Sequence, residues 1–294
     1  MMETPTTYSR REGVELLDRL LADGKRIFTI EDAASVATQL AIPRSTLHWA
    51  LYELTRSGWV RRPRRGLYLV DETHRGGAAP HPFAVATALV EPSAISHWSA
   101  LAHHGLTEQV PRIVTATTTR DLVTPRMRRG RRAGDKADRE DHPHGGADDG
   151  QPASVWEVDG LAVRYFRMRP EHFWGHEKVW VDEFSRVPIT DRERTVLDGF
   201  INPRAFGSLQ EVVGALEEHL ADIDVPRLAG YALRYGRGAT IKRLGYVLEQ
   251  LGATAEAIRP LLEAPIHGYR LLDPQGPDQG ARFARWHIRD NVAT

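Results

Sequence analysis

Five arginines stand close together in residues 56–65, and their side chains are the best candidates for chemistry in this sequence. They are Arg56, Arg61, Arg62, Arg64 and Arg65, with no acidic residue among them. A guanidinium group stays charged and forms paired hydrogen bonds with phosphate oxygens or a guanine edge. A segment that needs charge only for solubility usually mixes both signs. The cluster therefore favours binding of nucleic acid over a merely solvated hairpin.

The remaining charge is balanced, so any affinity for nucleic acid must be local. The 294 residues include 39 Lys and Arg against 39 Asp and Glu, and hydrophobic residues make up 41%, as in globular proteins. The absence of cysteine excludes disulfides and thiolate metal sites and favours the reducing cytoplasm. No signal peptide is recognisable, and the longest apolar run, residues 83–90, is too short to span a membrane.

Other residues with catalytic potential lack the spacing that catalysis requires. The stretch "GRGATIKRLG" at 236–245 contains glycines and a lysine without the spacing of a phosphate-binding loop. His97, His103 and His104 do not form the HExxH pattern of a zinc hydrolase. We therefore predict that the protein is not an enzyme and has no catalytic residue, metal site or cofactor.

Three helices are predicted in the first 58 residues, and Arg56 of the arginine cluster lies in the third. Leucines at helical spacing line one face of a first helix that ends near Gly24. Thr29 and Asp32 have the spacing of a capping box, which predicts the start of a second helix. A third helix is expected between Pro43, which suits a first turn, and Gly58, which suits a helix end.

A predicted hairpin follows and completes the order of a winged helix-turn-helix, which we place at residues 1–74. The segments "WVRRP" and "RGLYLV" read as short strands joined by a turn at residues 63–65. In this fold the third helix enters the major groove of double-stranded DNA, and the hairpin reaches the flanking backbone or minor groove. The arginine cluster then serves to neutralise phosphates.

The third helix is predicted to bury Leu47, Leu51 and Leu54 and to turn its opposite face outward. The predicted DNA contacts of helix and hairpin are Arg44, Ser45, Thr46, His48, Trp49, Arg56, Arg61, Arg62, Arg64 and Arg65. Two interpretations of Trp49 stay open. It either contacts thymine methyl groups or the sugar backbone, or it packs against the hairpin or a second domain.

Residues 75–294 are predicted to form a larger α+β domain, in which helices alternate with β segments. Capping-box spacing predicts that Thr190 and Glu193 start one helix and that Ser208 and Glu211 start another.

A second arginine cluster, at residues 126–132, lies in a segment of low hydrophobicity that we predict to be a mobile loop at 124–152. Acidic residues follow the arginines closely and compensate their charge. A disordered loop is therefore favoured over a second DNA contact, and the role of the cluster stays open.

Several segments together resemble the AbiEi family of antitoxins. "FTIEDAASVATQLAIPRSTLHWALYELTRSGWVRRPRRGLYLV" is similar to the family's winged-helix domain. "ISHWSALAHHGL", "PRIVTATTTR", "VPITDRERTVLDGFINPRAFGSLQEVVGAL" and "RLGYVLEQLG" resemble its second domain in the same order, and "LDP…RWHIRDN" resembles its tail. The segment at 124–152 has no counterpart.

This resemblance implies a promoter-binding antitoxin. The winged helix is expected to bind inverted repeats in the promoter of its own operon, and the second domain to counter a nucleotidyltransferase-like toxin encoded next door. The residues that carry the C-terminal resemblance are interpreted as structural: Ser96, Ser99, Arg194, Asp198, Arg243 and Gly245. For Arg243 a contact with phosphate or with a partner stays open as the alternative to a packing role. Arg194 and Asp198 lie one helical turn apart and are expected to pair.

Two other classes compete with this interpretation. A one-component transcription regulator would have the same winged helix and a C-terminal domain that senses a small ligand. A nuclease or other enzyme has the least support, because no catalytic constellation can be assembled.

Overall fold

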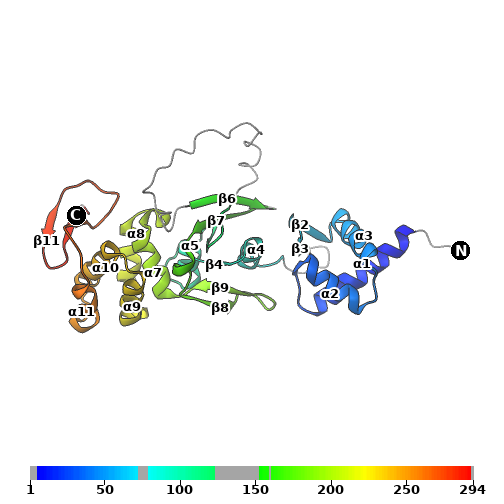
Figure 1. Cartoon of the computed structure of the whole chain (residues 1–294), viewed down its shortest axis with the longest axis horizontal. Helices are drawn as coiled ribbons and strands as arrows, with labels where there is room; N and C mark the ends of the chain where they lie inside the picture. Colours follow the sequence, from blue (N-terminus) through cyan, green and yellow to red (C-terminus); the bar gives the residue numbers. More distant parts are fainter. Residues whose placement is uncertain (1–4, 72–78, 123–151, 159, 293–294) are drawn as a thin grey trace, which may run out of the picture. The chain divides into compact units, whose positions relative to one another are not determined.

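The computed structural model describes residues 5–71, 79–122, 152–158 and 160–292. Helices and strands both occur throughout, which confirms the predicted mixed α and β class (Figure 1). The chain divides into two compact units: a first with residues 1–91, 157–161 and 178–187, and a second with residues 92–156, 162–177 and 188–294.

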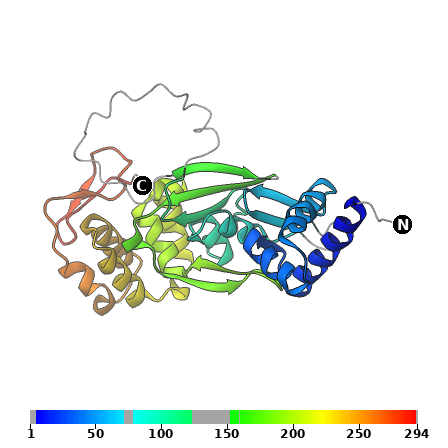
Figure 2. The same cartoon turned by 45° about the vertical axis from the view of Figure 1, so that its right-hand side comes forward.

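The first unit contains three helices, a three-stranded sheet and a further helix, shown in blue to cyan in Figure 2. Its helices are α1 (Pro5–Ala22), α2 (Ile30–Gln39), α3 (Arg44–Arg56) and α4 (Pro82–Leu89), and its strands are β1 (Ile27–Thr29), β2 (Val60–Arg64) and β3 (Leu67–Val70). The strand order is β1-β3-β2, and both pairings are antiparallel. This arrangement is the predicted winged helix-turn-helix, and we call the β2–β3 hairpin the wing.

Local sequence signals set the helix ends of this unit. The Thr29 side chain accepts a hydrogen bond from the Asp32 backbone, and the Asp32 carboxylate accepts one from the Thr29 backbone, so the predicted capping box is present. The α3 helix begins after Pro43 and buries Leu47, Leu51 and Leu54, as its apolar spacing predicts. These leucines pack with those of α1 in one core, which drives the three helices together.

The wing differs from the prediction in the position of its turn. The turn was expected at residues 63–65, but β2 continues through Arg64 and the turn lies at Arg65 and Gly66. Gly66 has a φ of +80°, a left-handed conformation that favours glycine. Pro63 lies where the β2–β3 register shifts, between Arg61 and Arg64. An irregularity of this kind tolerates a residue that cannot donate a ladder hydrogen bond.

Six further strands form one sheet, most of which belongs to the second unit. Its strands, in spatial order, are β6 (Pro152–Val158), β7 (Leu161–Arg167), β5 (Val114–Thr118), β4 (Ser93–Ile95), β9 (Arg186–Thr190) and β8 (His176–Trp180). The sheet is mixed, because β5 runs parallel to β7 and antiparallel to β4, while β4 runs parallel to β9. Its inner strands are largely buried, and their buried apolar residues include Ile95, Ala116 and Ile189.

Helices and a small C-terminal sheet complete the second unit. The helices are α5 (His97–His103), α7 (Arg192–Ile201), α8 (Leu209–Glu218), α9 (Val225–Tyr235), α10 (Gly238–Gln250) and α11 (Ala255–Glu263), with 3-10 turns at Pro170–His172, Pro203–Phe206 and Leu220–Asp222. The C-terminal sheet has the order β10 (Arg270–Leu271), β12 (Ile288–Asp290), β11 (Ala281–Phe283). The helices share one hydrophobic core, in which Phe200, Leu244 and Trp286 are almost fully buried.

One of the two predicted caps in this unit is wrong. Thr190 was expected to cap α7, but it ends strand β9, and the neighbouring Asp191 accepts the capping hydrogen bond from the Arg194 backbone. Glu193 reaches away from the helix start and accepts a hydrogen bond from the Asp224 backbone. The Thr190 hydroxyl instead lies 2.8 Å from the hydroxyl of Thr195, and the helix begins one residue later than its sequence spacing predicts. Ser208 caps α8 as predicted.

The buried charge of α7 supports a structural role for the residues that carry the C-terminal resemblance. The guanidinium of Arg194 pairs with Asp198 at 2.8 Å, and both side chains are almost fully buried. Arg194 also donates to the backbone oxygens of His172 and Trp174, so its buried donors find acceptors. Arg243 likewise donates to the backbone of Leu271 at 2.8 Å.

Gly245 lies directly under the ring of Trp286. A Cβ atom at this position would collide with the ring, so only glycine allows this close approach.

Three features of the sequence analysis lie outside the described residues: the predicted domain boundary near residue 74, nearly all of the predicted loop at 124–152, and the arginine cluster at 126–132. Among the described helices, none has the length and apolar character of a membrane span.

Candidate nucleic-acid interface

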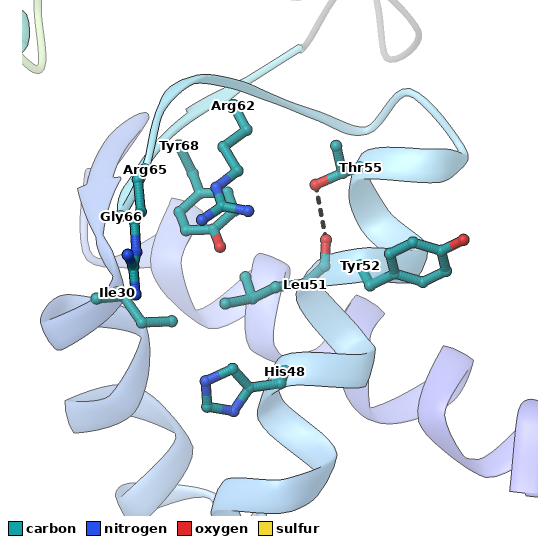
Figure 3. Close-up of a pocket in the computed structure, with 9 residues that line it drawn as sticks. All are labelled: Ile30, His48, Leu51, Tyr52, Thr55, Arg62, Arg65, Gly66 and Tyr68. Atoms are coloured by element: carbon teal, nitrogen blue, oxygen red, sulfur yellow. Dashed lines mark hydrogen bonds between the residues drawn. The ribbon is translucent and has the colours of Figure 1, made fainter. Parts of the chain in front are cut away.

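A cavity of about 410 Å³ lies between α3 and the wing (Figure 3). Its lining combines apolar, aromatic and basic side chains: Ile30, His48, Leu51, Tyr52, Thr55, Arg62, Arg65, Gly66 and Tyr68. Residues from the start of α2, the middle of α3 and both wing strands thus meet around one hollow. In Figure 3, Arg62 and Arg65 extend from the wing on one side and His48 approaches from α3 on the other.

The α3 helix presents polar side chains from its N-terminal turns. Arg44, Ser45 and His48 are exposed, and Thr46 is half-buried. A ring nitrogen of His48 lies 3.0 Å from the backbone oxygen of Arg44, which fixes the imidazole against the helix. Short polar groups and a fixed ring at this end of the helix are suited to hydrogen bonds with base edges.

Two aromatic rings stand out from the exposed face of α3. Trp49 is 60% exposed and Tyr52 is 56% exposed, and their rings meet edge to face with centroids 5.5 Å apart. Burial within the winged helix therefore does not explain either ring. Each ring restricts the other, so the pair forms a fixed apolar surface on the exposed face of α3.

Two of the predicted wing arginines are engaged within the first unit. Arg61 pairs with Asp71, with 3.5 Å between Nε and Oδ2. Arg64 donates from Nη2 to the backbone oxygen of Ala88 at 3.1 Å. Ala88 lies in the last turn of α4, where backbone oxygens lack partners within the helix. Both guanidinium groups therefore help to hold the wing in place.

The other two wing arginines are exposed and face the cavity. The guanidinium of Arg62 lies over the ring of Tyr68 at 5.7 Å from its centroid, and Arg65 lies at the turn. No described acidic side chain forms an ion pair with either arginine. Arg56 is also exposed, but it pairs with Glu53 at 3.0 Å, and this hydrogen bond raises its pKa above the usual value. Within the cluster at residues 56–65, the cations most available to a polyanion are thus Arg62 and Arg65.

The structure brings together only part of the predicted set. His48, Arg62 and Arg65 line one cavity, whereas Arg61 and Arg64 have partners of their own. Sequence reasoning missed Thr55 and Tyr68 as lining residues. All four residues of strand β3 are buried and apolar, so no alternation marks Tyr68 as the one that stacks under an arginine.

The described histidines and carboxylates of the second unit do not form a metal site. No group of three or more His, Asp or Glu side chains among the described residues is arranged to hold a metal ion. His97 is fully buried between the rings of Phe166 and Phe206, and Ser96 contacts its Nδ1 at 2.7 Å. Burial, aided by the charge of Arg194, lowers the pKa of His97 to about 3, so the ring is neutral. It is packed as a core residue.

A winged helix with exposed cations on its wing and polar groups on its third helix is the fold of DNA-binding transcription regulators. Residues 15–70 match the family model described as "Transcriptional regulator, AbiEi antitoxin". The match confirms the resemblance to AbiEi antitoxins over the winged helix and supports a DNA-binding regulator of the antitoxin class.

A solved structure with a similar fold is that of the RV2827C protein from Mycobacterium tuberculosis. It is 16% identical, the alignment covers 98% of this chain and 92% of that chain, and the TM-score is 0.59. At this identity the likeness concerns the fold alone. None of the curated proteins compared with the chain matches it.

Proposed function

We propose that this protein represses transcription of its own operon by binding inverted repeats in the promoter DNA. The observation that carries the proposal is the cavity between α3 and the wing, with Arg62 and Arg65 exposed at its edge. In the proposed complex the winged helix at residues 1–74 binds DNA in the cytoplasm, and residues 75–294 carry the antitoxin function.

In the proposed complex α3 contacts the bases and the wing contacts the phosphates. The polar N-terminal turns of α3 lie in the major groove, where Arg44, Ser45, Thr46 and His48 reach base edges, and Trp49 supplies an apolar contact. Arg62 and Arg65 neutralise phosphates of the flanking backbone, and Arg56 adds a further cation. Arg61 and Arg64 contribute by fixing the wing through Asp71 and Ala88.

A titration of double-stranded DNA at several salt concentrations tests this half of the proposal. The duplex from upstream of the gene is compared with a scrambled duplex of equal length. We expect tighter binding to the upstream duplex and a steep fall in affinity with salt. Equal, weak binding to both duplexes would leave only non-specific attraction and refute the repressor.

The second half of the proposal is that the protein counters a nucleotidyltransferase-like toxin encoded next to it. The antitoxin resemblance supports this role, because it continues beyond the winged helix into the second domain. Expression of the neighbouring gene alone is expected to inhibit growth, and co-expression with this protein to restore it. The R62A/R65A variant is the matched control, because it weakens operator binding and leaves the second domain intact. A neighbouring gene that does not affect growth would refute the antitoxin role.

A further inference from the structure

The C-terminal sheet has one face that packs on α10 and one face that does not. On the packed face, Ile288 is fully buried, Phe283 lies 5.0 Å from the ring of Tyr246, and the Tyr246 hydroxyl donates to Asp290 at 2.9 Å. Side chains alternate along a strand, so Arg282 in β11 and Arg289 in β12 point to the other face. Figure 1 shows β11 at the same end of the unit as α10 and α11.

Aromatic and basic groups gather on this other face. Arg282 lies opposite Arg289 in the β11–β12 pairing, so both belong to the face, together with His287. Tyr269, next to strand β10, lies beside them: its ring is 5.7 Å from the ring of His287. The guanidinium of Arg282 lies 5.5 Å from the centroid of the Tyr269 ring. One tyrosine ring is thus flanked by a guanidinium and an imidazole.

These side chains are accessible and not neutralised. Tyr269 is 40% exposed, and Arg282 and His287 are both exposed. Arg289 pairs with Asp278, but no carboxylate in the described part of the chain pairs with Arg282. The face therefore keeps a positive charge next to a half-exposed ring. His287 has a φ of +53°, an uncommon left-handed conformation, which turns the backbone just where its ring meets Tyr269.

We propose that this face binds single-stranded nucleic acid, with a base stacked on Tyr269 and the adjoining phosphate held by Arg282. A flat ring offers a stacking surface that every base can use, and a guanidinium beside it matches a phosphate. The positive charge of Arg282 favours a nucleic-acid strand over an apolar peptide on this face. It also favours a single strand over a duplex, because only an unpaired base exposes its flat surface to a side chain. The site is separate from the proposed operator contacts on α3 and the wing.

Fluorescence anisotropy with a labelled single strand of about twelve nucleotides tests the proposal, since this length is within the usual site size. Strands of RNA and of DNA with the same sequence are compared, because preference for RNA would indicate a contact to the 2′-hydroxyl. The full chain carries R62A/R65A in every measurement, so that the wing does not contribute. In this background we expect salt-dependent binding of at least one of the two strands.

Two variants remove the site, and two controls keep it. Tyr269→Leu removes the flat ring and is expected to weaken binding about ten-fold, whereas Tyr269→Phe retains the ring and the affinity. Arg282→Glu reverses the charge beside the ring and is also expected to weaken binding. Arg259→Glu makes the same charge change at an exposed position of α11 and should leave binding unchanged.

The proposal is overturned if neither strand binds in the R62A/R65A background. It is also overturned if Tyr269→Leu and Arg282→Glu bind as well as Arg259→Glu does. Unchanged nucleic-acid binding combined with the loss of a protein complex in Tyr269→Leu would assign the face to a protein partner instead. None of these results depends on whether the winged helix recognises its own promoter.

Discussion

The salt dependence of DNA binding distinguishes the two pairs of wing arginines. Arg62 and Arg65 are exposed at the cavity, whereas Arg61 and Arg64 are held by Asp71 and Ala88. When an arginine that neutralises one phosphate is removed, the slope of log affinity against log salt falls by about 0.9. The R62A/R65A variant should therefore have a slope that is shallower than that of the wild type by about 1.8.

This change in slope is large enough to measure. Between about 50 and 200 mM salt, the wild type should lose about 12-fold more of its affinity than R62A/R65A loses. Anisotropy titrations of the upstream duplex at several salt concentrations give the slopes directly. The matched control is Arg19→Ala, which removes an exposed arginine of α1 that is paired with Asp23.

The Arg64→Ala variant tests the opposite case, an arginine that is bound within the first unit. It removes the hydrogen bond to Ala88, so we expect a loss of about 1 kcal/mol of unfolding free energy, with the salt slope close to that of the wild type. A slope for R62A/R65A equal to that of the wild type would refute the reasoning. A fall in the slope caused by Arg64→Ala alone would refute it as well, because a guanidinium bound to α4 would then also contact a phosphate.

Three further predictions concern α3, the second unit and the helix caps. Trp49→Ala should weaken binding to the upstream duplex more than to the scrambled duplex and leave the salt slope unchanged, because it removes an uncharged contact. Thr29→Ala removes a helix cap and should lower the unfolding free energy by about 1 kcal/mol in urea titrations. His97 is neutral when folded, since its pKa is about 3, but binds a proton when unfolded below its ordinary pKa near 6.5. Stability should therefore fall by up to about 1.4 kcal/mol per unit as the pH drops below about 6.5, and urea titrations of His97→Asn should show a weaker dependence. A pH-independent wild type would contradict this assignment.

Much of the first unit could be predicted from short sequence patterns, because these patterns involve only residues that are close in the sequence. The capping box of Thr29 and Asp32 spans three residues, and the buried stripe of α3 repeats at helical spacing, so both can be recognised without knowledge of the fold. The pair of Arg194 and Asp198, one turn apart, is of the same kind. Two predictions of this type were wrong by one or two residues: the cap of α7 is Asp191 and not Thr190, and the wing turn lies at Arg65 and Gly66.

The division among the wing arginines could not be predicted from the sequence. Residues 61–65 contain four arginines that the sequence does not distinguish from one another. The partners of two of them lie outside this segment. Arg64 donates to a backbone oxygen 24 positions away, and Arg61 pairs with a carboxylate beyond the end of β3. A backbone acceptor carries no mark in the sequence, because every residue has one. The partners therefore became visible only with the tertiary structure.

The bond from Arg64 to α4 sets a lower limit on a usable DNA-binding fragment. A fragment cut after β3 would keep every predicted base and phosphate contact but would deprive Arg64 of its acceptor. The Arg64 guanidinium would then be free to bind phosphate. The affinity of the wing for any polyanion would rise, and its preference for the operator over other DNA would fall. A fragment for crystallisation or operator screening should therefore include the whole of α4, so that Arg64 keeps its acceptor.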